Sequence, residues 1–324
     1  MKPVQKIILP GVYDDAFYKK RTNRTGCFLG LDAAQQQKSQ DLLSNAVVGI
    51  AGAGGIGGML AMQLIRLGVR HIKLADPDVF DVTNINRQLG AEVGNIGKNK
   101  ATVVGEYVHK ITCDATIEIY PEGIQEHTAD DFVAGCDLIF DQTDFYLTNE
   151  RYALHRAFRN NPKAKCILAS CVWAWGANVY KFDRDVMLYD EQLGIPENKK
   201  LSEEDIERLF LMQVNYQNRF PSRPYIEDWI EANGNVPIHA VAPPLSCYLL
   251  ACRACLILCD LEREPFCTVL PPVPKYFWFD ASTFESGIFE FDGNWVNPNE
   301  YDKWFGPRSK FALDQVSPLS EKAA

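Results

Sequence analysis

Apolar and polar positions along this chain alternate between two periods, one typical of strands and one typical of helices. Short apolar runs typical of buried strands occur at residues 47–51, 72–76, 115–123, 136–144 and 164–171. Helical patterns occur between or beside them, at residues 31–46, 57–67, 101–111, 127–135 and 147–161. Strand and helix in alternation predict an α/β, Rossmann-like fold: a mostly parallel sheet with helices on both faces.

The two ends and the middle of the chain have different patterns. Residues 1–30 are polar and irregular, and we expect an N-terminal arm with a basic run at Lys19, Lys20, Arg21 and Arg24. Residues 275–296 alternate apolar and polar positions, which predicts antiparallel strands added towards the C-terminus. We therefore divide the chain into an arm (1–30), a Rossmann-like half (31–182), an insertion or lid (183–235) and a C-terminal half that completes the same domain (236–324).

Within the insertion, residues 201–220 predict an amphipathic helix, because "LSEED" carries a helix-capping signal. Residues 236–262 predict a buried helix that contains Cys252 and Cys255, the one CxxC pair of the sequence. A four-thiolate zinc site needs a second such pair. We therefore expect these cysteines to pack as small apolar side chains, and we expect no zinc.

Composition and charge narrow the function classes. A net charge of -9 argues against a general nucleic-acid-binding surface. No apolar run approaches the roughly 20 residues of a membrane helix, and the apolar stretch near the N-terminus is too short for a signal peptide. We expect a cytoplasmic protein without membrane contact, with its ten cysteines reduced.

The first chemical signal is a glycine-rich turn between a strand and a helix, Gly52-x-Gly54-x-x-Gly57. Glycines there let backbone N–H groups approach a phosphate at the helix N-terminus. Asp76 follows about 20 residues later, where an acid commonly binds ribose hydroxyls. These features suit NAD and ATP equally, and a turn that only packs strand on helix is a third interpretation.

The next loop favours ATP, because it places Arg87 and Lys100 within short reach of the glycines. A dehydrogenase has no need of a cation pair beside the phosphates. Cleavage of ATP between the α and β phosphates does need one, since negative charge builds there in the transition state. Arginine supplies a bidentate fork and lysine a compact charge, although either residue alone also fits a solvated surface cation.

A third signal is "CDLIFDQTDF", which places Asp141 and Asp144 at the carboxyl end of a predicted parallel strand. Ligands of open α/β sheets bind at such ends, and a carboxylate with phosphate oxygens suits Mg²⁺. Asp144 is the better placed for the metal, and Asp141 is expected to orient the loop. The alternative is an aspartate that caps the helix beginning near Leu147.

In this order, "GAGGIG", "LADPDVFDVTNINRQ", "GKNKA" and "DLIFDQTD" resemble the ThiF/MoeB/HesA family, over about residues 20–182 and more loosely 236–262. The resemblance implies an adenylyltransferase that binds Mg²⁺ and ATP. Such an enzyme attaches AMP to a carboxylate, usually the C-terminus of a small ubiquitin-like protein or peptide. It also implies a nucleotide site made of Gly52, Gly54, Gly55, Gly57, Asp76, Asp78, Asn84, Arg87, Gln88, Lys100 and Asp144.

The resemblance assigns a role to each of these residues. The glycines form the phosphate loop, and Asp76 holds the ribose with Asp78 beside it. Asn84, Arg87 and Lys100 contact the phosphates, Gln88 supports that loop, and Asp144 coordinates Mg²⁺. The segment "RTNRT" resembles an Arg-x-x-Arg pattern whose second arginine, here Arg24, reaches into the partner subunit's site. That role implies a homodimer.

The sequence also departs from the family pattern. Phe145 stands where an asparagine is usual, and no cysteine occurs between Cys171 and Cys247, where thioester-forming relatives often carry their nucleophile. Cys171 is either a nucleophile or a buried thiol, so the sequence does not predict a thioester step. Two alternatives to adenylation stay open. An NAD-dependent oxidoreductase leaves both cations and Asp144 unused, and these residues also argue against a catalytically silent binding partner.

Overall fold

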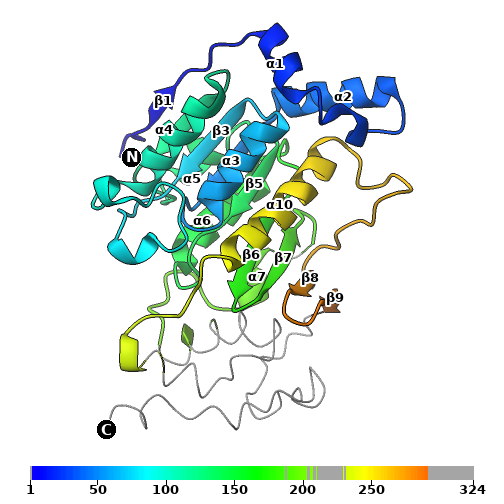
Figure 1. Cartoon of the computed structure of the whole chain (residues 1–324). Coiled ribbons are helices and arrows are strands. Elements are labelled where there is room, and N and C mark those ends of the chain that lie inside the picture. Colours follow the sequence, from blue (N-terminus) through cyan, green and yellow to red (C-terminus); the bar gives the residue numbers. More distant parts are fainter. Residues whose placement is uncertain are drawn as a thin grey trace.

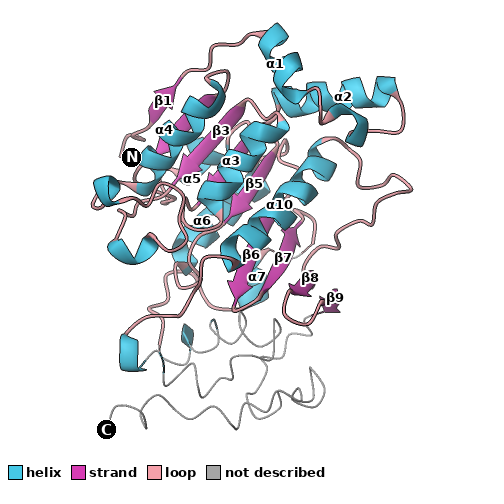
Figure 2. Ribbon diagram, viewed as in Figure 1, coloured by secondary structure: helices cyan, strands magenta, loops and turns pink. Residues whose placement is uncertain are grey.

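A computed structural model of the chain describes residues 2–186, 188–202, 205–206, 209, 229 and 231–290 (Figures 1 and 2). Its described part contains one sheet, in the strand order β1-β4-β3-β2-β5-β6-β7-β8-β9. Most of the helix predicted at 201–220, and the end of the tail beyond residue 290, lie outside the described residues.

Five neighbouring strands of the sheet run parallel, as predicted. They are β2 (Val47–Ala51), β3 (His71–Ala75), β4 (Thr116–Tyr120), β5 (Leu138–Asp141) and β6 (Ile167–Trp173). The antiparallel strands predicted within residues 275–296 are confirmed as β8 (Lys275–Asp280) and β9 (Glu285–Glu290), whereas the antiparallel β7 (Gly176–Phe182) between β6 and β8 was not predicted. The fold is thus a Rossmann-like mixed sheet.

Helices cover both faces of the sheet (Figure 1). On one face lie α3 (Gly57–Leu67), α4 (Lys100–Thr112) and α10 (Ala242–Leu258), and α2 (Ala33–Asn45) packs beside α10. On the other face lie α5 (Ala129–Val133), α6 (Thr148–Asn160) and α7 (Tyr189–Leu193). Each face therefore has its own buried core, as expected for a sheet covered on both sides.

Local sequence explains two of the helices that shape the site. Leu60, Leu64 and Ile65 of α3 are fully buried at helical spacing, and the helix ends at Gly68, which adopts φ 123°. α10 is apolar on nearly all sides. Of its CxxC pair, Cys255 is partly buried but Cys252 is exposed, so the prediction that both pack as small apolar side chains was wrong for Cys252. No helix among the described residues is long and apolar enough to cross a membrane.

The prediction of an irregular N-terminal arm was wrong. Residues 1–30 contain β1 (Ile7–Leu9), the helix α1 (Asp15–Thr22) and a 3-10 turn (Gly26–Phe28). The short apolar run pairs antiparallel with the exposed edge of β4, and the side chain of Asp14 caps α1 by accepting from two backbone N–H groups. The antiparallel strand at this edge was also not expected.

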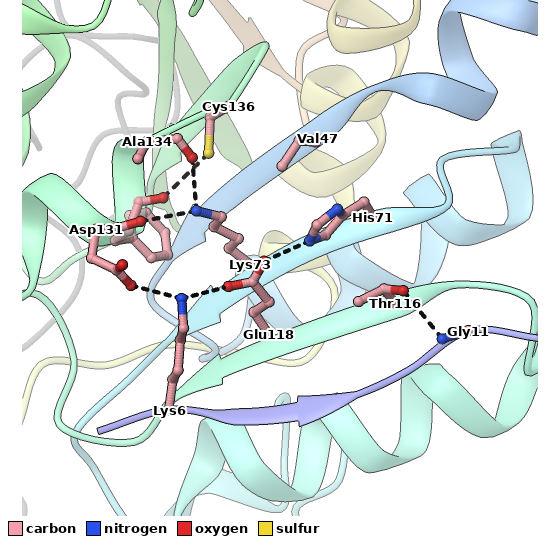
Figure 3. A network of polar contacts seen from close by, with 12 residues as sticks. Lys6, Gly11, Val47, His71, Lys73, Thr116, Glu118, Asp131, Ala134 and Cys136 are labelled. Atoms are coloured by element: carbon pink, nitrogen blue, oxygen red, sulfur yellow. Dashed lines mark hydrogen bonds and ion pairs between the residues drawn. The ribbon is translucent and has the colours of Figure 1, made fainter. Parts of the chain in front are cut away.

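A polar network on the α5 face fastens β1 to the sheet (Figure 3). Lys6 Nζ donates to Glu118 Oε2 (3.1 Å) and to Asp131 Oδ2 (2.9 Å). His71 Nε2 lies 2.7 Å from the other oxygen of Glu118, and Lys73 Nζ donates to two backbone carbonyls at the end of α5. The network links three strands and a helix that are distant in sequence.

The connections place a switch point between β2 and β5. From β2 the chain proceeds to β3 and β4 on one side, and then returns to place β5 and β6 on the other. In open α/β sheets, ligands bind in the crevice outside the carboxyl ends of the strands at such a point. The glycine turn follows β2, and Asp144 follows β5, so both predicted signals flank this crevice.

Candidate functional site

A cavity of about 870 Å³ opens over the carboxyl ends of the parallel strands. All of the predicted site residues except Arg24 line it, namely Gly52, Gly54, Gly55, Gly57, Asp76, Asp78, Asn84, Arg87, Gln88, Lys100 and Asp144. The structure thus brings together the three signals that the sequence analysis identified separately.

The backbone of the turn after β2 requires two of its glycines. Gly52 adopts φ 95°, which side-chain-bearing residues rarely adopt, and a Cβ at Gly57 would lie 1.8 Å from the carbonyl oxygen of Gly52. At Gly54 an added Cβ would meet no atom closer than 3.7 Å, on Gln88. The turn itself does not require glycine there, so the absent side chain leaves space for a ligand beside the backbone.

The carboxylate of Asp76 holds this turn in place through two hydrogen bonds. Its carboxylate accepts from the backbone N–H of Ala53 (2.7 Å) and from that of Asp78 (2.9 Å). Burial raises the pKa of Asp76 to about 6, while Lys100 and the two backbone donors partly oppose the shift. Asp76 therefore holds the glycine turn.

The two predicted cations lie on different elements. Lys100 is buried at the first position of α4, and its Nζ donates to Asp78 Oδ2 (2.9 Å). Arg87 donates to the carbonyl of Thr83 (3.1 Å) and to Asn86 Oδ1 (2.8 Å). Burial lowers the pKa of Arg87, and the Asp144 carboxylate acts in the opposite direction, so these two charges face one region of the cavity.

The loop that bears Arg87 is shaped by its own side chains. Asn84 Oδ1 accepts from the backbone N–H of Asp81 (3.1 Å), and the Asp81 carboxylate accepts in return from Thr83 N (2.8 Å). This reciprocal cap closes the 3-10 turn Val82–Asn84. Gln88 lies against Gly54, which agrees with a supporting role for its side chain.

The aspartates after β5 face different surroundings. Asp144 is exposed to the cavity, and Tyr146 donates its hydroxyl to Asp144 Oδ2 (3.0 Å). Asp141 is buried and accepts from Arg151 Nε (2.7 Å) and from Thr143 N (3.2 Å), and His155 lies 3.2 Å away. Burial alone would raise the pKa of Asp141, but Arg151 and His155 outweigh it and lower the pKa. Asp141 thus orients the loop, as predicted.

Three buried polar side-chain atoms at the cavity have no hydrogen-bond partner among the described residues. They are Oε1 of Gln88 and both amide atoms of Gln142. Buried polar atoms are normally paired, so such atoms are consistent with a polar ligand or ordered water in the cavity. The sequence analysis missed Gln142, although its position between Asp141 and Asp144 in the quoted motif was a usable signal.

The segment that leads into α10 forms another part of the cavity wall, also missed from sequence. Residues 234–238 and Pro243 line the cavity. Asn86 Nδ2 donates to the carbonyl of Ile238 (3.0 Å), and a Cβ on Gly55 would lie 3.1 Å from Pro243. These contacts join the glycine turn and the Asn86 loop to a segment that is distant in sequence. They leave no local pattern in the sequence by which they could be predicted.

Arg24 lies outside its own cavity. It is exposed in the turn after α1, and α1 is anchored at the far end of α3. Tyr18 donates to the carbonyl of Gly68 (2.9 Å), and Arg21 donates to that of Ile65 (2.8 Å) and pairs with Asp114 (2.9 Å). Because α3 begins at the cavity and has 11 residues, its far end is roughly 16 Å away.

No group of three or more histidine, cysteine, aspartate or glutamate side chains is placed to hold a metal within the described ranges. A cation at Asp144 would therefore take further ligands from a bound nucleotide and water, which is the usual pattern for Mg²⁺. The exposed Asp144 carboxylate fits that arrangement.

Comparisons with known proteins identify related sequences. The model of the ThiF family matches residues 29–216, more than half of the chain. The adenylyltransferase and sulfurtransferase UBA4 of Candida albicans is 30% identical over 141 residues, which cover 42% of this chain and 32% of that protein. The tRNA threonylcarbamoyladenosine dehydratase of Haemophilus influenzae is 35% identical over 118 residues, or 36% of this chain and 45% of that protein. The chain thus spans less than half the length of these relatives.

Solved structures share the fold. PaaA superimposes with a TM-score of 0.60 at 17% identity, covering 84% of this chain and 73% of that chain. Escherichia coli MccB with ATP gives a TM-score of 0.59 at 18% identity, covering 86% and 73%. These similarities extend the match in architecture beyond the region of sequence similarity.

Proposed function

Since the chain belongs to the ThiF family, we propose that it uses ATP to adenylate a carboxylate and releases pyrophosphate. The acceptor in this proposal is the C-terminus of a small ubiquitin-like protein or peptide. One observation carries the proposal: a glycine turn, two cations and an exposed carboxylate line one cavity at the switch point of the sheet. Relatives named as adenylyltransferases, among them UBA4, support it.

The cavity residues fit a nucleotide. Asp76 lies where it can accept from ribose hydroxyls, and the open space at Gly54 admits phosphates to the backbone N–H groups at the start of α3. Arg87 and Lys100 are donors without acceptor capacity, suited to phosphate oxygens. Asn84 and Gln88 then keep the Arg87 loop in place, and Asp78 holds Lys100 in a cavity-facing position.

In the proposed reaction an oxygen of the acceptor carboxylate bonds to the α-phosphorus of ATP. The bond from that phosphorus to its bridging oxygen breaks, and pyrophosphate leaves with the electron pair. Arg87 and Lys100 stabilise the negative charge that develops on the leaving group. Mg²⁺ held by Asp144 would neutralise phosphate charge. No protein nucleophile takes part, so the thiol of Cys171 is not required.

The proposed active assembly is a homodimer in which Arg24 of each chain serves the cavity of the other. Arg24 is exposed and lies at the end of α3 remote from its own cavity, which is compatible with a role in a partner's site.

Isotope exchange between pyrophosphate and ATP tests the reaction. We expect exchange when a carboxylate acceptor is present and none in its absence. Exchange without any acceptor would contradict the assignment. Tight binding of NADH without exchange would favour the oxidoreductase alternative, which the glycine turn and Asp76 also allow. Binding of ATP with no exchange for any acceptor, including the chain's genomic neighbours, would favour a catalytically silent member.

A further inference from the structure

The cavity extends beyond the residues that we assign to the nucleotide. Asp76 follows β3 and the glycine turn follows β2, while the cavity continues past Asp144 to residues of β6 and β7. Neighbouring strands lie about 4.8 Å apart, so β6 is roughly 14 Å from β3 along the sheet. A nucleotide whose ribose is at Asp76 and whose phosphates are at the glycine turn would occupy only the first part of this distance.

The remaining part, which we term the far lobe, has walls of mainly apolar side chains. Its residues include Ala169 and Cys171 of β6, Tyr180 and Phe182 of β7, and Tyr189 of α7, with Ser170 and Gln192 as polar members. The pairing of β6 with β7 sets Ala169 opposite Tyr180 and Ile167 opposite Phe182, so these side chains share the α6 face of the sheet. Cys171, the partly exposed member, is one pleat nearer the carboxyl end of β6.

The buried cation at the far lobe is already paired. Arg151 lines the cavity, but its guanidinium is paired with Asp141 and stacks on the ring of Tyr189, 3.6 Å from the ring centroid. Burial opposes the charged form of Arg151, and Asp141 more than compensates, so its pKa is raised. Glu150 also lines the cavity and disfavours an acidic side chain there. The chemistry of the lobe therefore matches an apolar or aromatic group.

We infer that the far lobe binds the side chain of the acceptor's terminal residue, and that this side chain is apolar and of leucine or phenylalanine size. The inference rests on the proposed adenylation. If the acceptor carboxylate meets the α-phosphate beside Asp144, its own side chain must lie on the side of the cavity away from the nucleotide, where the lobe is.

The test uses four small carboxylates as acceptors in ATP–pyrophosphate exchange: N-acetylglycine, N-acetyl-leucine, N-acetylphenylalanine and N-acetylaspartate. We expect kcat/KM for the leucine or phenylalanine derivative to exceed that for the glycine derivative by at least about tenfold, the scale of discrimination that an apolar pocket provides. The aspartate derivative should be the poorest acceptor, because its second carboxylate would enter an apolar lobe beside Glu150.

A matched pair of variants tests whether the far lobe causes the preference among acceptors. Cys171→Leu fills the lobe and should lower the phenylalanine-to-glycine ratio of kcat/KM by about tenfold. Cys252→Leu makes the same change on the exposed surface of α10 and should keep the wild-type ratio. If Cys171→Leu does not fold, the acceptor series with the wild-type chain still decides the matter.

The outcomes separate this inference from the proposed function. Equal rates for the four acceptors, or a preference for glycine or aspartate, would overturn the inference and leave adenylation standing. Nucleotide binding without exchange for any of the four would also overturn it, because the lobe would then hold no carboxylate near the nucleotide. A chain that binds no ATP, measured by displacement of a fluorescent ATP analogue, would overturn the proposed function as well.

Discussion

At the scale of the residue, Asp76 has a structural role beside the ribose-binding role that we propose for it. Its two oxygens hold the backbone of the glycine turn from a buried position, and the cost of that burial raises its pKa to about 6. The sequence predicted the ribose role from the distance to the glycines. It could not predict the hydrogen bonds to Ala53 and Asp78, because these depend on how β3 ends beside β2.

The raised pKa of Asp76 predicts a pH dependence of nucleoside binding. Its folded-state pKa of about 6 exceeds the ordinary 3.8, so the carboxylate is charged above pH 6 and becomes protonated below it. A protonated acid is a poorer acceptor for two ribose hydroxyls. We expect adenosine, which carries no titrating phosphate, to bind several-fold more weakly at pH 5 than at pH 7.5, as measured by calorimetry. Asp76→Asn should flatten this dependence; a wild-type affinity that is independent of pH would contradict it.

The raised pKa of Asp76 also makes the stability of the folded chain depend on pH, in the direction opposite to that of nucleoside binding. Because folding raises the pKa of Asp76, its burial destabilises the folded chain most where the carboxylate is charged, above about pH 6, and this cost is relieved as the pH falls towards 4.

The two charged side chains Arg87 and Asp144 at the cavity give a second prediction. Arg87→Ala and Asp144→Ala should each lower the rate of ATP–pyrophosphate exchange by at least about a hundredfold, because each removes a group that meets charge developing in the transition state. Arg66→Ala, an exposed arginine on α3, is the matched control and should retain wild-type exchange. Circular dichroism checks that the variants fold. Wild-type rates in either cavity variant would refute the site assignment.

At the scale of the element, the turn from β2 into α3 is the part of the site most strictly determined by its sequence. Gly52 and Gly57 are required by backbone geometry, and Gly54 is required only if a ligand occupies the adjacent space. The glycine spacing predicted this turn correctly because the constraint is local. The β1 strand was missed for the opposite reason: three apolar residues become a strand only because the edge of β4 is available.

Two glycine variants separate backbone geometry from ligand binding. Gly57→Ala places a Cβ 1.8 Å from the carbonyl oxygen of Gly52, so the turn must shift, and we expect the free energy of unfolding to fall by about 3 kcal/mol. Gly54→Ala should leave stability within about 1 kcal/mol, since its Cβ meets no close atom, yet weaken ATP binding. Urea denaturation and nucleotide titration measure both. Equal loss of stability in the two variants would contradict this division.

The polar network at β1 makes the stability of the folded chain depend on pH (Figure 3). The hydrogen bond from His71 is the largest contribution that lowers the pKa of Glu118, from 4.5 to about 2, with Lys6 and Lys73 contributing in the same direction. Because the folded-state pKa is the lower one, the stabilisation is complete above pH 4.5 and is lost as the pH falls towards 2. No local pattern predicts this network, since Lys6 and Glu118 are 112 residues apart.

Glu118→Gln should therefore lower the free energy of unfolding at pH 7 by about 2 kcal/mol, the scale of hydrogen bonds to a charged group. It should also reduce the decline in stability between pH 4.5 and 2. Glu106→Gln, an exposed change on α4, is the control and should match the wild type. Denaturant midpoints across pH measure the effect. A decline in the Glu118 variant as steep as in the wild type would assign the acid sensitivity to other groups.

At the scale of the whole molecule, many short stretches between residues 52 and 243 build the cavity, and they come from both halves of the sequence. The parallel core and its helices could be predicted from periodicity, and the three motifs from their chemistry. The far lobe could not, because Tyr180 and Phe182 read as ordinary core positions of a strand. Their access to the cavity depends on the register between β6 and β7 and on the placement of α7 over them.

The proposed exchange of Arg24 between subunits predicts complementation. Arg24→Ala and Arg87→Ala should each be inactive alone. Mixed in equal amounts and allowed to exchange subunits, they should recover about a quarter of wild-type activity, since half of the dimers are mixed and each mixed dimer has one intact site. Pyrophosphate exchange measures the recovery. If no activity returns although mixed dimers form, Arg24 has no role across the interface.

The anchoring of α1 at the far end of α3 has a kinetic consequence. Because Arg24 is held far from the cavity of its own chain, a small local movement cannot bring it there. Total activity would then fall with the square of the concentration below the dissociation constant of the pair, so turnover per molecule would fall in proportion to concentration, and an inert copy in excess would restore it by supplying Arg24.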